Sequence, residues 1–188
     1  MIMDKFRRGI NKVANIFNLK KNKVITGTDV YIRGRMYIEG TGITIGSHVW
    51  INSEISANPI GGNEFTSFVT YNKGNITIGN NVGLSNVAIC SMASVTIDND
   101  VMIGGSCKIY DTDFHSVEYE KRMMLHDQDI HTAPIHIKKG AFIGAHSIIL
   151  KGVTIGERAV VGAGSVVTKS IPDDEIWVGN PAQFKRKI

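Results

Sequence analysis

Residues 137–171 have the sequence IKKGAFIGAHSIILKGVTIGERAVVGAGSVVTKSI, and this stretch decides the fold. Isoleucine or valine occupies every sixth position: Ile137, Ile143, Ile149, Ile155, Val161 and Val167. The fourth residue after each of these is mostly small: Ala141, Ser147, Val153, Ala159, Ser165 and Ile171. A period of six fits neither an amphipathic helix, which repeats about every 3.6 residues, nor a single alternating strand, which repeats every two.

A six-residue repeat fits short strands that are joined by tight turns. Three such sides close a triangular coil of about 18 residues, and the aliphatic side chains of successive coils stack inside it. Glycine and asparagine at the corners supply the positive φ angles that tight turns need. The repeat therefore predicts an all-β protein, built as a parallel β-helix of hexapeptide repeats.

The same pattern continues towards the N-terminus. The middle of the chain carries it at Ile78, Leu84, Cys90, Ile97, Ile103 and Ile109, with one extra residue after Cys90. A looser form occurs at Ile32, Ile38, Ile45 and Ile51. The chain holds 27 isoleucines and 16 valines but only 4 leucines, and such β-branched residues favour strands over helices. This composition excludes a helical bundle.

Charge and targeting signals narrow the class of protein. The net charge of +4 is too small to indicate a nucleic-acid-binding protein. No apolar run is long enough to span a membrane, and the charged start lacks the apolar region of a signal peptide. Cys90 and Cys107 form no disulfide framework, so we interpret them as small core residues in a reducing compartment. We expect a cytoplasmic protein.

The repeat divides the chain into three parts. Residues 1–23 form an N-terminal amphipathic cap, because Phe6, Ile10, Val13 and Phe17 fall at helical spacing. We expect this helix to cover the open end of the coils; a basic helix lying on a membrane is the second interpretation. Residues 24–172 form the β-helix, with loop insertions at 58–75 and 115–134. Residues 173–188 form a C-terminal tail.

Four short segments near the C-terminus carry a resemblance to a known family. Three lie in the repeats, and they are IGAH at 143–146, GVTIG at 152–156 and VGAGSVVTK at 161–169. The fourth is GNPA at 179–182, in the tail. In these the chain resembles the hexapeptide-repeat acyltransferases, whose fold is a left-handed parallel β-helix, and above all the galactoside and maltose O-acetyltransferases and their capsule- and lipopolysaccharide-modifying relatives. The resemblance implies a homotrimer that moves an acetyl group from acetyl coenzyme A to a sugar hydroxyl, without a metal. The acceptor would be a precursor of a cell-surface polysaccharide.

The candidate catalytic residue is His115, which ends the middle run of repeats and begins the long polar loop. A residue there sits at an outward corner, and the resemblance assigns the catalytic base to this point. Asp113 or Asp111 is a candidate for orienting its imidazole. Aspartate is also common at corners simply because its side chain stabilises turns. Asn86 matches an asparagine that helps to hold the acceptor in the resembled enzymes. Alternatively, Asn86 only occupies a corner of the coil where the backbone has a left-handed conformation.

The resemblance also implies a coenzyme A site near the C-terminus. Ala145 and Ala163 match positions whose backbone binds the pantetheine arm. Thr168 and Lys169 match side chains near the nucleotide end, and Arg186 matches a basic residue of the tail that reaches phosphate. The other basic residues near the two ends have a simpler interpretation as solvated surface charge.

Three alternative functions remain open. The same scaffold transfers acyl groups to amino sugars, serine or antibiotics. Some relatives are zinc carbonic anhydrases, and His126, His131 and His136 recur here at a spacing of five, although the first two fall in the predicted loop. The third alternative is a non-catalytic structural solenoid, which would not bind coenzyme A.

Overall fold

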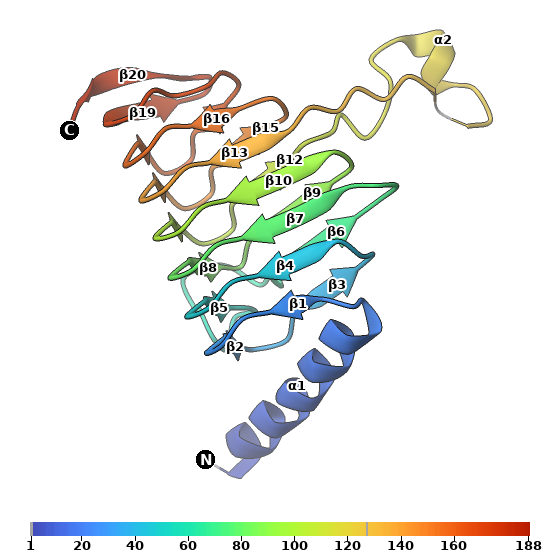
Figure 1. The fold of residues 1–188 in the computed structure, drawn as a ribbon, viewed down its shortest axis with the longest axis vertical. Helices are drawn as coiled ribbons and strands as arrows, with labels where there is room; N and C mark the ends of the chain where they lie inside the picture. Colours follow the sequence, from blue (N-terminus) through green and yellow to red (C-terminus); the bar gives the residue numbers. More distant parts are fainter. Residues whose placement is uncertain (1, 127) are drawn as a thin grey trace.

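The computed structural model describes residues 2–126 and 128–188. In it, short parallel strands wind into coils of triangular cross-section (Figure 1). The strands form three sheets, A, B and C, one for each side of a left-handed β-helix. Sheet A contains β1 (Ile25–Thr26), β4 (Ile43–Ile45), β7 (Asn75–Ile78), β10 (Ser94–Ile97), β13 (Ile135–Ile137) and β16 (Thr154–Ile155). Sheet B contains β2 (Tyr31–Arg33), β5 (Trp50–Asn52), β8 (Gly83–Ser85), β11 (Met102–Ile103), β14 (Phe142–Ile143), β17 (Val160–Val161), β19 (Glu175–Gly179) and β20 (Ala182–Lys187). Sheet C contains β3 (Tyr37–Glu39), β6 (Ser67–Thr70), β9 (Ala88–Ser91), β12 (Lys108–Tyr110), β15 (Ile148–Leu150) and β18 (Val166–Val167).

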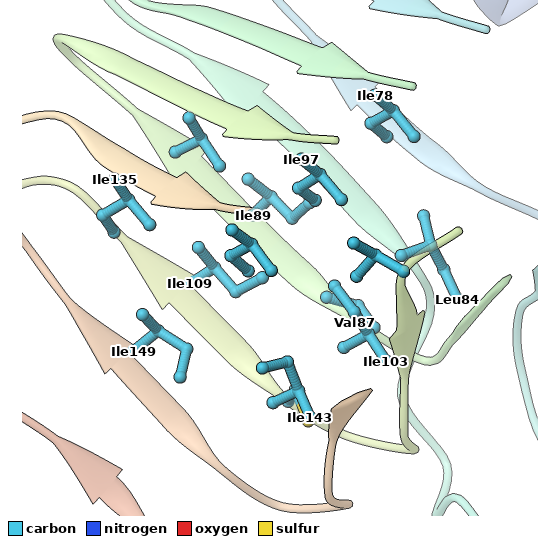
Figure 2. Packing of buried hydrophobic residues seen from close by; sticks show 14 of the residues in the cluster. Ile78, Leu84, Val87, Ile89, Ile97, Ile103, Ile109, Ile135, Ile143 and Ile149 are labelled. Atoms are coloured by element: carbon cyan, nitrogen blue, oxygen red, sulfur yellow. The ribbon is translucent and has the colours of Figure 1, made fainter. Parts of the chain in front are cut away.

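The register between coils confirms the hexapeptide repeat. His136 lies beside Thr154, 18 positions further along the chain, so one coil takes 18 residues there. Because each strand pairs with the strand one coil away, the repeated aliphatics point inward and stack on one another (Figure 2). Ile137, Ile143 and Ile149 are fully buried in this core.

One position of the predicted inward column is wrong. The pairing of β9 with β12 places Ile89, not Cys90, beside the inward residue Ile109. Ile89 belongs to the aliphatic core, whereas Cys90 lies beside Tyr110 on the outer face of sheet C. The six-residue count fails here because the turn before β9 is one residue shorter and the turn after it is longer. Cys107 lies in the core as predicted.

The two insertions leave the coils in register. The first occupies residues 53–66 rather than 58–75, because residues 67–70 form β6 and pair with β9. The second runs from residue 111 to residue 134 between β12 and β13 and contains α2 (Tyr119–Arg122). It projects from the β-helix (Figure 1), and one of its predicted members, residue 127, lies outside the described part. Three apolar side chains near its tip are exposed: Met123, Met124 and Leu125.

The C-terminal tail closes the last coil. Strand β19 pairs in parallel with β17, and β20 then returns antiparallel to β19, so the tail extends sheet B. Trp177 of β19 packs against the aliphatic core. The turn between the two strands contains a cis peptide bond at Asn180–Pro181.

Helix α1 (Ile2–Lys21) lies against the first coil mainly through asparagines. The amide of Asn15 donates to the Gly34 carbonyl at 2.9 Å and accepts the Met36 N–H at 3.0 Å. Asn18 donates to the Met36 carbonyl at 3.3 Å, and Asn22 donates to the Ile38 carbonyl at 3.1 Å. These bonds satisfy backbone groups of the first coil, which has no preceding coil to pair with.

The helix therefore contacts the first coil through its asparagine face and not through the apolar face that was expected to cover the coils. Phe6, Val13 and Phe17 are 72%, 68% and 65% exposed, so the apolar stripe points to solvent. Leu19 is the helix residue that packs against the aliphatic core. Among the described helices, none has the length and apolar character needed to cross a bilayer.

We expect Asn15→Ala to lower the free energy of unfolding by about 1–3 kcal/mol, because it leaves the buried Met36 N–H without its partner. Urea titration of the full chain measures this. Lys12→Ala on the same helix is the control, because Lys12 is exposed and its loss should change stability by less than about 0.5 kcal/mol. Equal effects of the two substitutions would show that the asparagine bonds do not hold α1.

Candidate active site

His115 lies at the root of the long insertion, directly after sheet C. It is exposed and follows Phe114, which has a φ of +64° and packs edge-on against Tyr110 with ring centroids 5.1 Å apart. Two contacts tie the start of the loop to its end: the Asp113 N–H donates to the His131 carbonyl at 3.1 Å, and Thr112 forms an antiparallel bridge with Thr132. The structure thus places the imidazole at the rigid base of a projecting loop, as the sequence predicts.

Asp111 has a structural role that the sequence analysis missed. Its carboxylate is fully buried and accepts hydrogen bonds from Ser91 Oγ at 2.7 Å, the Met92 N–H at 2.7 Å and the Ala93 N–H at 2.9 Å. It therefore fixes the turn between β9 and β10, one coil away. The prediction that Asp111 orients His115 is wrong, because its oxygens are held by this turn.

Asp113 also has a different partner from the one expected. Its Oδ1 lies 2.5 Å from Nζ of Lys151, which follows β15 in the next coil. Both side chains are partly exposed, at 26% and 31%. The pair links the root of the loop to the neighbouring coil, and the carboxylate is directed to Lys151 rather than to the imidazole of His115. Lys151 could have been found from the sequence, because one coil places it beside the residues that follow β12.

Asn86 is a corner residue, with a φ of +51° and a fully buried side chain. Its Nδ2 donates to the Glu64 carbonyl at 2.6 Å, and its Oδ1 accepts from Asn58 Nδ2 at 2.9 Å. Both ends of the amide thus hold the first insertion against the coil. The geometry contradicts the prediction that this side chain binds the acceptor, because the insertion covers it.

Ala145 and Ala163 lie one above the other at the corner between sheets B and C. The Gly164 N–H donates to the Ala145 carbonyl at 2.8 Å. A Cβ on Gly144 would come within 2.5 Å of the Ala163 nitrogen, so only glycine allows the two coils to approach so closely. Ala145 is partly exposed and Ala163 is exposed at this corner.

The three remaining predicted residues of the coenzyme A site are all exposed at the C-terminal end. Thr168 and Lys169 lie in the turn after β18, and Arg186 lies on β20 with its Nη1 donating to the Lys187 carbonyl at 2.9 Å. They contribute two positive charges to this end of the molecule. The structure brings them to the same end of the β-helix as Ala163.

A single chain does not gather these residues into one cleft. His115 follows the end of β12 in sheet C, whereas Ala145 and Ala163 precede the starts of β15 and β18 in the same sheet. His115 and the corner at Ala145 and Ala163 therefore lie at opposite ends of the strands of sheet C. A cavity of about 660 Å³ lies instead between α1 and the first coil.

Neither cysteine is suited to nucleophilic catalysis. Burial raises the pKa of both thiols to about 11, and for Cys90 the nearby Asp111 carboxylate adds to the effect. Cys107 donates its thiol proton to the Gly144 carbonyl at 3.2 Å. A thiol with such a pKa is almost wholly protonated near neutral pH, so the chain offers no reactive thiolate here.

The predicted histidine alternative for zinc finds no support in the geometry. His136 Nε2 lies 3.0 Å from an oxygen of Asp98 on the outer face of sheet A, and His131 lies 3.7 Å from Asp129 in the loop. Within residues 2–126 and 128–188, no three histidine, cysteine or carboxylate side chains are grouped as metal ligands.

Comparison with known proteins identifies the repeat. Residues 134–169 match the family model described as bacterial transferase hexapeptide (six repeats). Over 146 residues, the chain is 32% identical to galactoside O-acetyltransferase of Escherichia coli K12, covering 77% of this chain and 64% of that enzyme. The alignments cover only 28–64% of the first curated relatives, so this chain spans less than two thirds of their length.

Solved structures share the fold over almost the whole chain. A variant of the N-acyltransferase AntD from Bacillus cereus, in complex with dTDP-4-amino-4,6-dideoxyglucose and coenzyme A, superposes with a TM-score of 0.73 at 26% identity, covering 92% of this chain and 88% of that one. A hexapeptide-repeat acetyltransferase of Vibrio cholerae with acetyl coenzyme A gives a TM-score of 0.62 at 27% identity, covering 92% and 74%. The bound molecules show that this fold takes coenzyme A in those proteins.

We expect Asp111→Asn to lower the free energy of unfolding by about 1.5–3 kcal/mol, because an amide cannot accept all three hydrogen bonds of the buried carboxylate. Asp113→Asn is the matched control. It breaks a partly exposed ion pair and should cost less than about 1 kcal/mol. Urea unfolding measures both, and an Asp113→Asn loss as large as that of Asp111→Asn would contradict the assignment.

Proposed function

Because the chain belongs to the hexapeptide-repeat transferases, we propose that it transfers an acetyl group from acetyl coenzyme A to a hydroxyl of a sugar. The observation that carries this proposal is the exposed His115, held at the rigid root of the loop beside sheet C. The buried, protonated cysteines support direct transfer rather than a thioester intermediate on the protein. The acceptor we favour is a precursor of a cell-surface polysaccharide.

In this mechanism His115 acts as the general base. Its neutral imidazole takes the proton of the acceptor hydroxyl while the hydroxyl oxygen attacks the thioester carbonyl. The carbon–sulfur bond then breaks, and the leaving coenzyme A thiolate takes the proton from the imidazolium of His115, which returns the base to its neutral form. Backbone N–H groups at a coil corner would stabilise the negative charge on the carbonyl oxygen. The contacts that bind Asp113 to Lys151 and to His131 hold the loop root in place during this step.

The coenzyme A site is proposed at the C-terminal corner. Backbone groups near the small, solvent-accessible residues Ala145 and Ala163 would bond the amides of the pantetheine arm. Thr168, Lys169 and Arg186 supply a hydroxyl and two positive charges for the phosphates of the nucleotide end. The thioester bound at this corner must then meet a catalytic histidine, and His115 of the same chain lies at the other end of the sheet C strands.

We propose that the histidine comes from a second copy in a homotrimer. The outward positions of sheet B form a row in which Gly83 lies between Trp50 and Met102. Four apolar members of this row are each about half exposed: Tyr31, Trp50, Met102 and Phe142. The corresponding positions of sheet A are mostly threonines, as at Thr44, Thr77 and Thr96. Sheet B is therefore the side that a neighbouring copy would cover, and cyclic packing repeats the contact three times.

The acceptor could also be an amine. The AntD structure described above contains an amino sugar, and the same base can take the proton that a neutral amine loses as its nitrogen attacks the thioester carbonyl. A panel of free and nucleotide-linked sugars with labelled acetyl coenzyme A distinguishes the two acceptors. A product that survives mild alkali is an amide, whereas an ester is hydrolysed.

We expect His115→Ala to lower kcat by about 10²–10⁴-fold while leaving coenzyme A binding and stability near wild type, because the exposed imidazole fills no core volume. Steady-state kinetics and calorimetry measure these quantities. The control is His48→Asn at a distant corner, where asparagine tolerates the φ of +57°. If His115→Ala keeps more than about a tenth of the activity, the base lies elsewhere, and His136 would be tested next.

We expect light scattering to give three times the 20.6 kDa mass of the chain. Met102→Glu should shift the protein towards monomer, because it places a charge in the apolar row of sheet B. Thr77→Glu makes the matched change on the exposed face of sheet A and should leave the trimer intact. A fully active monomer would refute the shared site.

A further inference from the structure

Helix α1 carries two parallel stripes with different roles. Asparagines lie at positions 11, 15, 18 and 22, and apolar residues lie at 6, 10, 13 and 17, each set one helical turn apart. The two sets are offset by five positions, which places them about 140° apart around the helix. The first stripe is occupied by hydrogen bonds to the β-helix and to Glu54, so the second must face outward. The outward face forms a shallow groove lined by Phe6, Gly9, Ile10, Val13, Ala14 and Phe17.

Basic side chains border the outward stripe on both sides. The helix contains six basic residues and one acidic residue. Lys20 and Lys21 are both exposed and lie about 50° to either side of the centre of the apolar stripe. Arg8 and Lys12 face away from the stripe and line the cavity between α1 and the first coil. An apolar strip between basic borders complements a surface that is apolar inside and anionic outside.

The position of α1 in the fold indicates whether a lipid bilayer or a second protein copy covers the apolar stripe. The helix lies across the N-terminal end of the coil stack, beyond the first coil (Figure 1). Copies that pack against the flat sides of the prism leave this end uncovered. In a cyclic trimer the ends of the three prisms face the same way, so the three outward stripes would lie in one plane. Helices this basic would also repel one another if they were packed together.

We propose that α1 docks the protein on an anionic lipid bilayer, with the apolar stripe inserted at the interface and the basic borders on the lipid phosphates. The helix lies on the surface and does not span it. This inference is independent of the proposed acyl transfer, because it depends on the orientation of α1 against the first coil and not on His115. It would hold the catalytic loop at a fixed height above the membrane.

Sedimentation of the full chain with vesicles tests the proposal. We expect binding to vesicles of phosphatidylcholine with phosphatidylglycerol, weaker binding to phosphatidylcholine alone, and release at high salt. Phe6→Ser combined with Phe17→Ser should weaken binding at least tenfold. The control is Ile60→Ser combined with Leu125→Ser, which removes apolar side chains of comparable exposure, 90% and 94%, from the two insertions.

Charge variants separate the two parts of the surface. Lys20→Gln with Lys21→Gln should weaken binding by about fivefold per charge. Lys185→Gln with Lys187→Gln removes the same charge from the opposite end and should have no effect. The proposal is overturned if the wild-type chain does not bind anionic vesicles, or if both lysine pairs matter equally. It is also overturned if the phenylalanine variant changes the mass in light scattering, because the stripe would then join protein copies.

Discussion

The parallel backbone pairing between neighbouring coils is the constraint on which the rest of the molecule depends. Each strand has only two to six residues and cannot be stable alone, so it satisfies its N–H and C=O groups on the coils above and below. That pairing sets the stacking of the inward isoleucines and leaves their outward neighbours in straight rows. The first coil has no coil beneath it, and the asparagines of α1 supply the missing hydrogen-bonding partners.

The stacked aliphatic side chains fill the interior of the prism. Chemistry is therefore restricted to the corners, to the insertions and to the spaces between copies. His115 at the loop root and the corner at Ala145 and Ala163 both obey this restriction. They lie at opposite ends of the strands of sheet C, which is why the site proposed above draws on a second copy of the chain.

The fold and the place of His115 followed from the sequence, because a six-residue period and its interruption are local signals. The roles of Asp111 and Asn86 did not. The partners of Asp111 lie at Ser91 and Met92 and those of Asn86 on the first insertion, so both depend on which residues the coil pairing and the loop bring together. The face of α1 was misjudged for a related reason: asparagine and apolar residues share the same helical spacing, and the usual rule that apolar faces turn inward failed where unpaired backbone needed partners.

The pairing across the insertions has an evolutionary consequence. Thr44 lies beside Thr77 and Thr96 beside His136, although 33 and 40 positions separate the two pairs, against 18 for an uninterrupted coil. Lengthening such a loop adds little closure entropy, about 0.6 kcal/mol for each doubling. Insertions and deletions at these corners are therefore nearly neutral for folding. Descendants of one scaffold can therefore exchange whole loops without redesigning the core.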